Sequence, residues 1–464
     1  MDTYSAVVTT GIYCRPGCSA RPDAANVRPF AHAAAAEVAG FRACLRCRPY
    51  RSPEPLRADG PELVCRAVGL ITDGALDGAT EADLAARLAV SPRHLRRLFG
   101  EHLGLTPDQL ARSRRVHFAR RLLDDTDLSV TQIAFAAGFG SVRQLNRACR
   151  DVFRAPPTQL RARRRKADRL VADGGLPLRL PFRGSLDWEA MVGFLAPRAI
   201  AGVEHVTAGT YRRTIAIQGD PGVIEVSRGG PDHLVLVAHL PHWEGLIHLV
   251  DRARRLFALD APVEEARRHL AADPIVGPSV TGRPGLRVPG AWDGFEVGVR
   301  AIVGQQVSVA GATTMLGRLA QRCGRAVPGL ESMGLGRLFP TAEEVIGADL
   351  DGLGLTRARQ RAVAALAVAV ADGTVRLDRT RPLDELAAEL TALPGIGPWT
   401  AQYVGLRLGD RDALPTGDLG LVRALEQHHG HADGRAALDE AAARWSPWRA
   451  TAALHLWTTH GPAP

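Results

Sequence analysis

The sequence predicts a multidomain, mainly α-helical protein with one α+β segment. A chain of 464 residues is longer than one hydrophobic core normally supports. Four of the seven cysteines form two close pairs before residue 50, strand-like alternation is confined to the middle of the chain, and capped helical patterns fill most of the rest. We therefore expect a small cysteine-rich domain, a helical domain, a basic linker, an α+β domain and an all-α domain, at residues 1–52, 60–160, 161–175, 176–283 and 284–464.

Positive charge is concentrated in the first third of the chain. The net charge is +9, but residues 1–170 carry 28 Lys and Arg against 17 Asp and Glu, a net charge of +11. Such an excess is typical of a region that binds nucleic acid, so we expect nucleic acid as a partner. Compositional bias is the alternative: it explains why Lys166 is the single lysine among 58 basic residues, but it does not explain the gradient.

Targeting signals are not visible in the sequence. It contains neither a run of about 18 apolar residues nor a basic-then-apolar leader, so it predicts no membrane span and no signal peptide. We expect a cytoplasmic protein that does not bind membranes, in which cysteines are reduced or bind metal.

The two cysteine pairs have the spacing of a metal site. “YCRPGCSA” contains Cys14-x3-Cys18, and “FRACLRCRPY” contains Cys44-x2-Cys47. Four thiolates converging on one ion suit the tetrahedral preference of Zn²⁺, and the metal would stabilise a segment too short to form a core. Spacing alone favours a purely structural zinc site.

The residues between and around these cysteines indicate more than a structural role. The segment “VVTTGIYCRPGCSARPDAANVRPFAHAAAAEVAGFRACLRCRP” closely resembles the metal-binding domain of the Ada family of DNA-repair and regulatory proteins. The resemblance implies one Zn²⁺ held by Cys14, Cys18, Cys44 and Cys47, with Cys14 accepting a methyl group from a methylphosphotriester in DNA. Zinc would keep Cys14 as a thiolate, the nucleophilic form. Methylation would remove one negative charge and so weaken repulsion from DNA phosphates, as a switch without turnover.

Residues 60–160 contain two helix-turn-helix patterns. In “LAARLAVSPRHLRRLFGEHLG” Ser91 suits an N-cap and Pro92 a first helical position. In “LSVTQIAFAAGFGSVRQLNRACRDVF” Gly138 suits the turn and Ser141 the N-cap, and Cys149 is expected in the core. The polar faces of the two second helices carry Arg93, Arg96 and Arg97, and Arg143, Gln144 and Arg147. An arginine-bearing face is usually only solvated, but two tandem units of one design favour recognition helices for the DNA major groove.

These paired units resemble the DNA-binding domain of AraC-type transcription factors, which also follows the zinc domain in the Ada family. The resemblance implies double-stranded promoter DNA and RNA polymerase as partners. Ada-family proteins normally continue into a second methyltransferase with a Pro-Cys-His-Arg motif. That motif is absent and Cys323 has no such neighbours, so we do not expect repair of O6-methylguanine by that route.

The α+β segment is indicated by three alternating stretches, “YRRTIAIQG”, “GVIEVSRGG” and “HLVLVAHL”, followed by a helical pattern over 242–258. From residue 284 onward the patterns are almost entirely helical.

“LPGIGPWTAQY” at 393–403 predicts a tight reversal between two helices. An amphipathic pattern over 383–392 precedes it, and Pro398 suits the first turn of the next helix. Gly395 and Gly397 lack Cβ, so their N–H groups can approach a phosphate closely at a helix N-terminus. This is the form of a helix-hairpin-helix that grips the DNA backbone, although a plain helix connector is the default interpretation.

The following sequence favours the DNA-binding interpretation. Resemblance to the AlkA family of helix-hairpin-helix glycosylases, 3-methyladenine DNA glycosylase II, covers nearly all of 176–460. It rests on “LPFRGSLDWEAMVGFLAPRAIAGVE”, “RPGLRVPGAWDGFEVGVRAIVGQQVSVAGA”, “LPGIGPWTAQY” and “RWSPWRATAALHLW”. The resemblance implies that Asp418 is catalytic and stabilises an oxocarbenium-like sugar or orients water. By position alone, an aspartate at a helix start is more commonly an N-cap.

The same resemblance implies a base pocket and a wedge. Trp399, Tyr403 and Trp457 match pocket positions, where electron-rich rings attract a cationic alkylated base by about 0.5–2 kcal/mol per contact. We expect Trp445 and Trp448 in the core. Because the base must be flipped out of the duplex, a side chain has to fill the gap. Gln306 in “VGQQVS” matches this wedge position, where the best-known family pattern has leucine.

Two absences in the sequence predict the reaction type. Strand-nicking relatives use a lysine Schiff base, but Trp399 follows “PGIGP” and Lys166 is distant in the linker. No cysteine follows Cys323, so an iron–sulfur cluster is not expected. The glycosylase half should need no cofactor beyond a backbone-bound monovalent cation, which the family allows. We expect monofunctional hydrolysis of the N-glycosidic bond of bases such as 3-methyladenine.

The sequence thus predicts a bacterial, nucleoid-associated fusion of a methyl-sensing transcription activator with a DNA glycosylase. Two alternatives stay open. One is a transcription factor whose glycosylase-like half binds DNA without catalysis, and the other is an enzyme whose N-terminal half is only a zinc-stabilised DNA tether.

Overall fold

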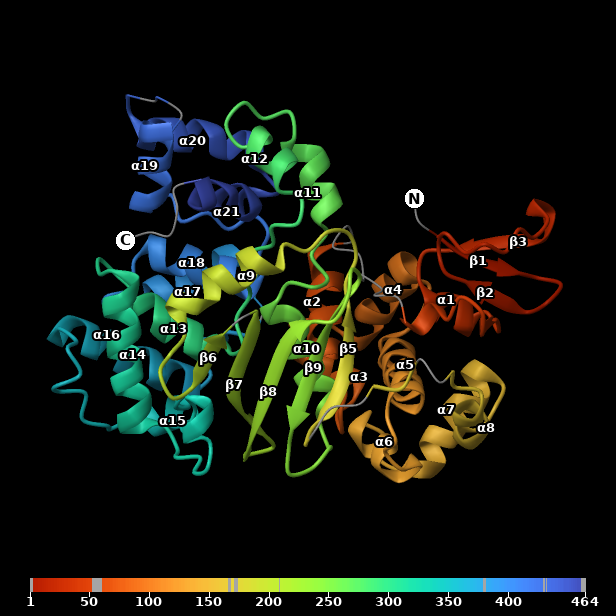
Figure 1. Ribbon diagram of the computed structural model, residues 1–464. Coiled ribbons are helices and arrows are strands. Elements are labelled where there is room, and N and C mark those ends of the chain that lie inside the picture. Colours follow the sequence, from red (N-terminus) through yellow and green to blue (C-terminus); the bar gives the residue numbers. More distant parts are fainter. Residues whose placement is uncertain are drawn as a thin grey trace. The chain divides into compact units, whose positions relative to one another are not determined.

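The computed structural model describes residues 3–51, 61–165, 168–170, 174–207, 209–378, 381–428, 430 and 432–459, and Figure 1 shows their helices and strands. The chain divides into two compact units. The first comprises residues 1–183, 217–220 and 231–251, and the second comprises 184–216, 221–230 and 252–464. Within the part of the chain that is described, no helix is long and apolar enough to cross a membrane.

The cysteine-rich segment is a four-stranded sheet with a short helix, drawn in red in Figure 1. Its elements are β1 (Tyr4–Val7), β2 (Ile12–Cys14), β3 (Val27–Phe30), α1 (Ala33–Val38) and β4 (Arg42–Ala43). The strand order is β3-β1-β2-β4, with β1 antiparallel to both neighbours and β2 parallel to β4. Tyr13 pairs with Ala43, which brings the end of β2 beside the start of the second cysteine pair.

Seven helices follow, and two of them are the predicted recognition helices. They are α2 (Glu62–Thr72), α3 (Glu81–Arg87), α4 (Pro92–Leu103), α5 (Pro107–Asp125), α6 (Val130–Ala136), α7 (Val142–Phe153) and α8 (Pro157–Ala162). The capping predictions are confirmed: the Ser91 side chain accepts a bond from the His94 N–H before α4, and the Ser141 side chain accepts one from the Gln144 N–H before α7. Gly138 has φ +77° at the turn between α6 and α7. The sequence therefore encodes both helix starts locally.

The α+β part contains a five-stranded sheet of order β5-β9-β8-β7-β6. The strands are β5 (Leu176–Pro181), β6 (Glu204–Thr207), β7 (Thr210–Ile217), β8 (Asp220–Arg228) and β9 (His233–His239). β5 pairs antiparallel with β9, and β6 pairs antiparallel with β7. The three alternating stretches correspond to β7, β8 and β9, and α10 (Leu246–Leu256) lies inside the predicted helix.

The rest of the second unit is helical, as the patterns predict. Its helices are α9 (Trp188–Leu195), α11 (Val263–Leu270), α12 (Gly277–Gly282), α13 (Gly294–Val303), α14 (Val309–Cys323), α15 (Ala342–Val345), α16 (Arg357–Ala371), α17 (Leu383–Thr391), α18 (Pro398–Leu408), α19 (Leu419–His428), α20 (Gly434–Trp445) and α21 (Arg449–Thr459). One hydrophobic cluster joins α13 to α18, and another joins α11, α12, α19, α20 and α21. Trp445 and Trp448 are buried in the second cluster, which confirms their predicted core position.

Ion pairs between buried side chains fix α13 to the adjacent strands. Arg213 on β7 lies 2.7 Å from Glu296 on α13, and Arg300, one turn later on α13, lies 2.7 Å from the same carboxylate. Arg300 also pairs with Glu204 on β6. Because each of these buried charges has an opposite partner, removing one would leave the others uncompensated. The network sets the position of the helix that leads into the loop at 304–308.

Candidate functional site

The four predicted metal ligands lie close together. The sulfur atoms of Cys14, Cys18 and Cys47 are all within 4.8 Å of one another. Cys44 lies near them, because its thiol shifts the pKa values of Cys14 and Cys47. In a tetrahedral site with Zn–S distances of about 2.3 Å the sulfurs are roughly 3.8 Å apart. The donor set and its spacing therefore fit one Zn²⁺.

The clustered thiols perturb one another's pKa values. A hydrogen bond with Cys47, together with burial, raises the pKa of Cys14. The same hydrogen bond lowers the pKa of Cys47 to about 5. Neighbouring thiolates repel each other, so the cysteines share protons unless a cation is bound. Zinc would replace those protons and allow every ligand to be a thiolate.

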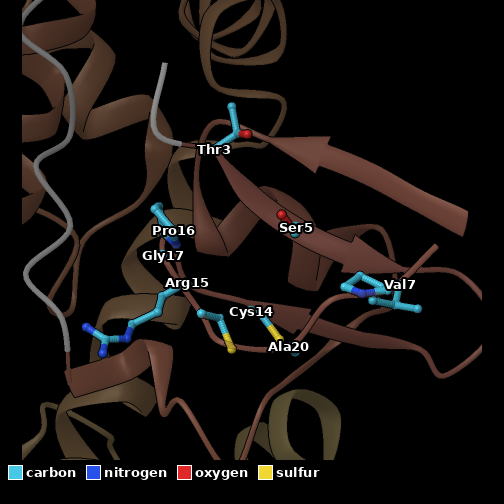
Figure 2. Close-up of a pocket in the computed structure, with 10 residues that line it drawn as sticks. Thr3, Ser5, Val7, Cys14, Arg15, Pro16, Gly17 and Ala20 are labelled. Carbon is cyan, nitrogen blue, oxygen red and sulfur yellow. The ribbon is translucent and has the colours of Figure 1, made fainter. Parts of the chain in front are cut away.

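A cavity of about 220 Å³ opens beside Cys14. In Figure 2, Thr3, Ser5 and Val7 lie along one side of it, and Cys14 and the turn that follows lie along the other. Cys14 is only 7% exposed, and it is one of the residues that line this cavity. Hydroxyl groups of Thr3 and Ser5 give the cavity a polar wall.

The cysteine-rich segment is bonded to α5 through Glu37. The Glu37 carboxylate accepts bonds from the Tyr13 hydroxyl at 2.6 Å and the Ser113 hydroxyl at 2.7 Å, and it lies 2.5 Å from His117 Nε2. Tyr13 directly precedes Cys14 on β2, and both Ser113 and His117 are on α5. Sequence inspection missed Glu37, because a single glutamate at the end of an alanine-rich helix carries no signal of its partners.

All six predicted recognition side chains are exposed on α4 and α7. On α4, Arg96 pairs with Glu81, and Arg97 Nη1 lies 2.7 Å from Glu101. No acidic partner is found for Arg143 or Arg147 on α7 among the described residues. Leu95, Phe99, Leu145 and Cys149 face inward, which confirms the predicted division of each helix into a polar and an apolar face.

The structure places Asp418 at the start of α19, where its carboxylate has four donors. Oδ1 accepts from the backbone N–H groups of Gly420 at 2.9 Å and Leu421 at 3.1 Å, so Asp418 is indeed a helix cap. Oδ1 also accepts from Trp457 Nε1 at 2.9 Å, and Oδ2 accepts from Trp399 Nε1 at 3.1 Å. A cap needs only the backbone donors, so the two indoles give this carboxylate a fixed orientation that capping does not require.

The three predicted pocket rings lie together around Asp418. Trp399 and Tyr403, one turn apart on α18, are stacked with centroids 5.3 Å apart and planes 10° apart. Trp457 on α21 meets Tyr403 edge-on, at 6.5 Å and 62°. The three rings thus come from elements of both hydrophobic clusters of the second unit, with α18 in one and α21 in the other. Its rings offer flat faces to a planar ligand.

Two residues next to these rings, Arg407 and Gly420, could not be identified from the sequence. Arg407 Nη1 donates to the Tyr403 hydroxyl at 3.0 Å. Burial raises the pKa of Tyr403, but the charges of Arg407 and Arg198 outweigh it, so the pKa lies below the usual 10.0. At Gly420, a Cβ would lie 3.0 Å from Asp418 Oδ1 and 3.4 Å from Trp457 Cδ1. The glycine leaves room for the indole to reach the carboxylate.

The reversal between α17 and α18 has the predicted form. Gly395 has φ +80°, a conformation that glycine tolerates, and Gly397 precedes Pro398, the first residue of α18. A Cβ on Gly397 would meet nothing within 4 Å. Gln306, the predicted wedge, is exposed in the loop between α13 and α14, with φ +52°. Lys166 lies outside the described residues.

Four family models match successive parts of the chain. They are described as the metal binding domain of Ada (residues 2–50), a helix-turn-helix domain (84–163), the AlkA N-terminal domain (177–293) and an HhH-GPD superfamily base excision DNA repair protein (299–450). The fold and the sites thus define a protein that combines an Ada-type metal domain and a helix-turn-helix with a helix-hairpin-helix base excision domain.

Whole-chain similarity gives the family. The sequence is 41% identical over 459 residues to the probable bifunctional transcriptional activator/DNA repair enzyme AlkA of Mycobacterium tuberculosis, covering 98% of this chain and 92% of that protein. The chain belongs to the family of this bifunctional enzyme. This confirms the predicted fusion and the multidomain, mainly α-helical fold.

Other relatives match only one part of the chain each. DNA-3-methyladenine glycosylase 2 of Escherichia coli is 34% identical over 59% of this chain and 94% of its own length. The bifunctional transcriptional activator/DNA repair enzyme Ada of the same species is 39% identical over 29% of this chain and 37% of its own length. A 3-methyladenine DNA-glycosylase structure from Archaeoglobus fulgidus superposes with a TM-score of 0.52 at 21% identity, over 61% of this chain and 98% of that one, which shows the shared fold.

Proposed function

We propose that the chain is a monofunctional DNA glycosylase for alkylated bases, fused to a methyl-responsive transcription activator. The observation that carries the enzymatic half is the Asp418 carboxylate, which receives two indole N–H groups beside a stacked aromatic pocket. The names of the relatives, a DNA-3-methyladenine glycosylase and a bifunctional DNA repair enzyme, support the substrate class.

The reaction follows from the chemistry of the base. An alkylated purine is already cationic, so when the N-glycosidic bond breaks its electron pair neutralises the leaving base. The sugar keeps the positive charge at C1′, which the Asp418 carboxylate stabilises electrostatically. Oδ1 already has three donors, whereas Oδ2 has only the Trp399 indole, so Oδ2 retains a lone pair for C1′ or for a water. Water then adds to C1′ and its proton is released.

No lysine amine takes part in this scheme. Lys166, the one lysine of the chain, is 233 positions from Trp399 in the sequence, and Trp399 occupies the site where a Schiff-base lysine would stand. We therefore infer base removal by water without strand cleavage. The bend at Gly395 and Gly397 would grip the phosphate backbone next to the lesion, and a monovalent cation on its carbonyl groups would complete that grip.

The test is release of 3-methyladenine from methylated duplex DNA. We expect release by the wild type and a loss of at least about 100-fold in Asp418→Asn, because an amide cannot neutralise the developing cation. Asp433→Asn is a matched control. Asp433 also caps a helix by accepting two backbone N–H bonds, but it accepts no hydrogen bond from an indole. Base release by Asp433→Asn should therefore stay near that of wild type. Wild-type protein that releases no base would favour the alternative of a DNA-binding half without catalysis.

For the N-terminal half we propose a stoichiometric methyl transfer to Cys14. The four clustered thiols and the cavity beside Cys14 support it. Cys14, Cys18, Cys44 and Cys47 would hold Zn²⁺, which supplies the cation that keeps all four as thiolates. The Cys14 sulfur attacks the methyl carbon of a methylphosphotriester, the carbon–oxygen bond breaks, and the phosphodiester leaves as an anion. The thioether that forms carries no charge.

Mass spectrometry of cysteine peptides tests this step. After incubation with methylphosphotriester DNA, we expect one added methyl group on Cys14 and none on Cys149, which is buried in the helical domain. An unmodified Cys14 would mean that the zinc segment serves only as a tether for DNA.

The loss of one negative charge on methylation would increase the affinity of the N-terminal half for DNA. We propose that α4 and α7 then bind promoter DNA through Arg93, Arg96, Arg97, Arg143, Gln144 and Arg147. RNA polymerase is the proposed partner of the activated state, in keeping with relatives named as transcriptional activators.

A further inference from the structure

The loop between α13 and α14 is bonded to the helix-hairpin-helix through one side chain. Gln305 Nε2 donates to the Gly395 carbonyl oxygen at 3.0 Å and to Thr400 Oγ1 at 2.9 Å. Gly395 lies in the bend, and Thr400 lies in the first turn of α18, where it is buried. Both hydrogens of the amide are therefore used to hold the hairpin.

A third element reaches the same residue. Arg359 on α16 donates through Nη2 to the backbone carbonyl of Gln305. α16 also packs closely on the bend, because a Cβ on Gly395 would lie only 3.0 Å from the Ala362 Cβ. Gln305 is thus bonded by its side chain to the hairpin and by its backbone to the helix that supports the hairpin.

These bonds matter for the next residue, Gln306. Its φ of +52° lies in the left-handed region, which residues other than glycine adopt rarely and only where the surroundings impose it. The bonds to the side chain and the carbonyl of Gln305 fix the backbone on the N-terminal side of Gln306. Ser308 fixes the backbone on the C-terminal side of Gln306, because its hydroxyl accepts a bond from the Gly311 N–H and so fixes the start of α14. The result is an exposed Gln306 side chain at a defined place.

We propose that Gln305, supported by Arg359, is a positioning residue for base flipping: it sets the wedge Gln306 at a fixed distance from the phosphate-gripping hairpin. The inference rests on the proposed glycosylase function. A wedge has to enter the duplex at the nucleotide whose backbone the hairpin holds, and a loop free to move would first have to be ordered. Gln305 removes that requirement without touching the reacting atoms.

The test compares a lesion that must be flipped with one that is already unstacked. A single 7-methylguanine is placed either opposite cytosine in a duplex or in a one-nucleotide bulge. Rates of base release are then measured with enzyme in excess. Gln305→Glu keeps the size of the side chain but cannot donate to the Gly395 carbonyl. We expect the paired rate to fall about tenfold and the bulge rate to stay within about twofold of wild type.

Gln360→Glu is the matched control. Gln360 also donates from its amide, to the backbone carbonyls of Leu350 and Leu355 and to the Asp351 carboxylate, so Gln360→Glu likewise loses its donors and places a carboxylate against acceptors. None of these partners lies in the loop or the hairpin. The variant's ratio of bulge rate to paired rate should equal that of wild type. A Gln305→Glu variant that loses both rates equally, or loses neither, overturns the positioning role. Wild-type enzyme inactive on both DNAs, and no better than Asp418→Asn, would instead show that the proposed glycosylase function fails.

Discussion

The two proposed reactive anions, the Cys14 thiolate and the Asp418 carboxylate, are both shielded from most of the solvent, but their neighbours differ in kind. Around Cys14 the neighbours are other thiols, which compete for protons and raise its pKa. Around Asp418 the neighbours are N–H donors, two from indoles and two from the helix start. The first anion therefore depends on a bound cation, and the second is stabilised by the protein alone.

This difference suits the two proposed reactions. A metal-bound thiolate that gives up its charge on methylation changes the electrostatics of its whole domain, which is useful for a signal delivered once. A carboxylate held by neutral donors keeps its charge and its position through the reaction, which is useful for repeated turnover.

Removal of zinc should separate the two sites most completely. Treating the protein with a strong chelator is expected to abolish methylation of Cys14, because the four thiols can no longer all be deprotonated and the small sheet loses its main source of stability. Base release should be unchanged in the same sample. Mass spectrometry and the 3-methyladenine assay measure both, and adding Zn²⁺ back should restore methylation. Loss of base release on chelation would contradict the comparison.

Weakening the donors around Asp418 should have the next largest effect. Trp457→Phe keeps an aromatic ring but removes one bond to Oδ1. A hydrogen bond to a charged group contributes about 1.5–3 kcal/mol, so the single-turnover rate should fall about 10-fold to 100-fold.

Trp448→Phe provides the comparison for that variant, because Trp448 is buried in the cluster against which Trp457 packs, and its indole has no bond to Asp418. Equal losses in both variants would mean that the indole of Trp457 serves packing only. Methylation of Cys14 should be unaffected in either case.

Much of this arrangement could be predicted from the sequence because it is encoded locally. Ser91 and Ser141 cap the helices they precede, and Pro398 begins the helix it was expected to begin. Alternation gave β7, β8 and β9, since a strand with one buried face alternates with a period of two. The rings of the pocket came from the family resemblance, and the structure places them together.

What could not be predicted depends on pairs of residues distant in the sequence. Nothing in “VGQQVS” indicates that Gln305 bonds to a hairpin about ninety residues later, and nothing in “DLGLV” indicates that Gly420 leaves room for Trp457. The effect of Arg198 on Tyr403 and the hydrogen bonds of Glu37 likewise depend on residues that are distant in the sequence. A side-chain contact between elements leaves no periodic trace in either element, so only the fold reveals it.

The smallest expected effect concerns the charge of the pocket. The charges of Arg407 and Arg198 outweigh the effect of burial and lower the pKa of Tyr403. Its phenol therefore begins to ionise at a lower alkaline pH than an ordinary tyrosine does. A phenolate attracts a cation more strongly than a phenol does. The KM for DNA containing 3-methyladenine should therefore fall by a few-fold as pH rises towards that pKa, whereas kcat changes little.

Tyr403→Phe keeps the stacked ring and removes the ionisable hydroxyl, so this alkaline fall in KM should disappear. Tyr211→Phe is the matched control, because burial raises the pKa of Tyr211 well above the usual value and its hydroxyl donates to Glu204 away from the pocket. KM profiles of both variants between neutral and alkaline pH decide the matter. If Tyr403→Phe keeps the wild-type KM profile, the rings attract the base through their neutral faces alone. Ionisation of Tyr403 then has no part in binding the base.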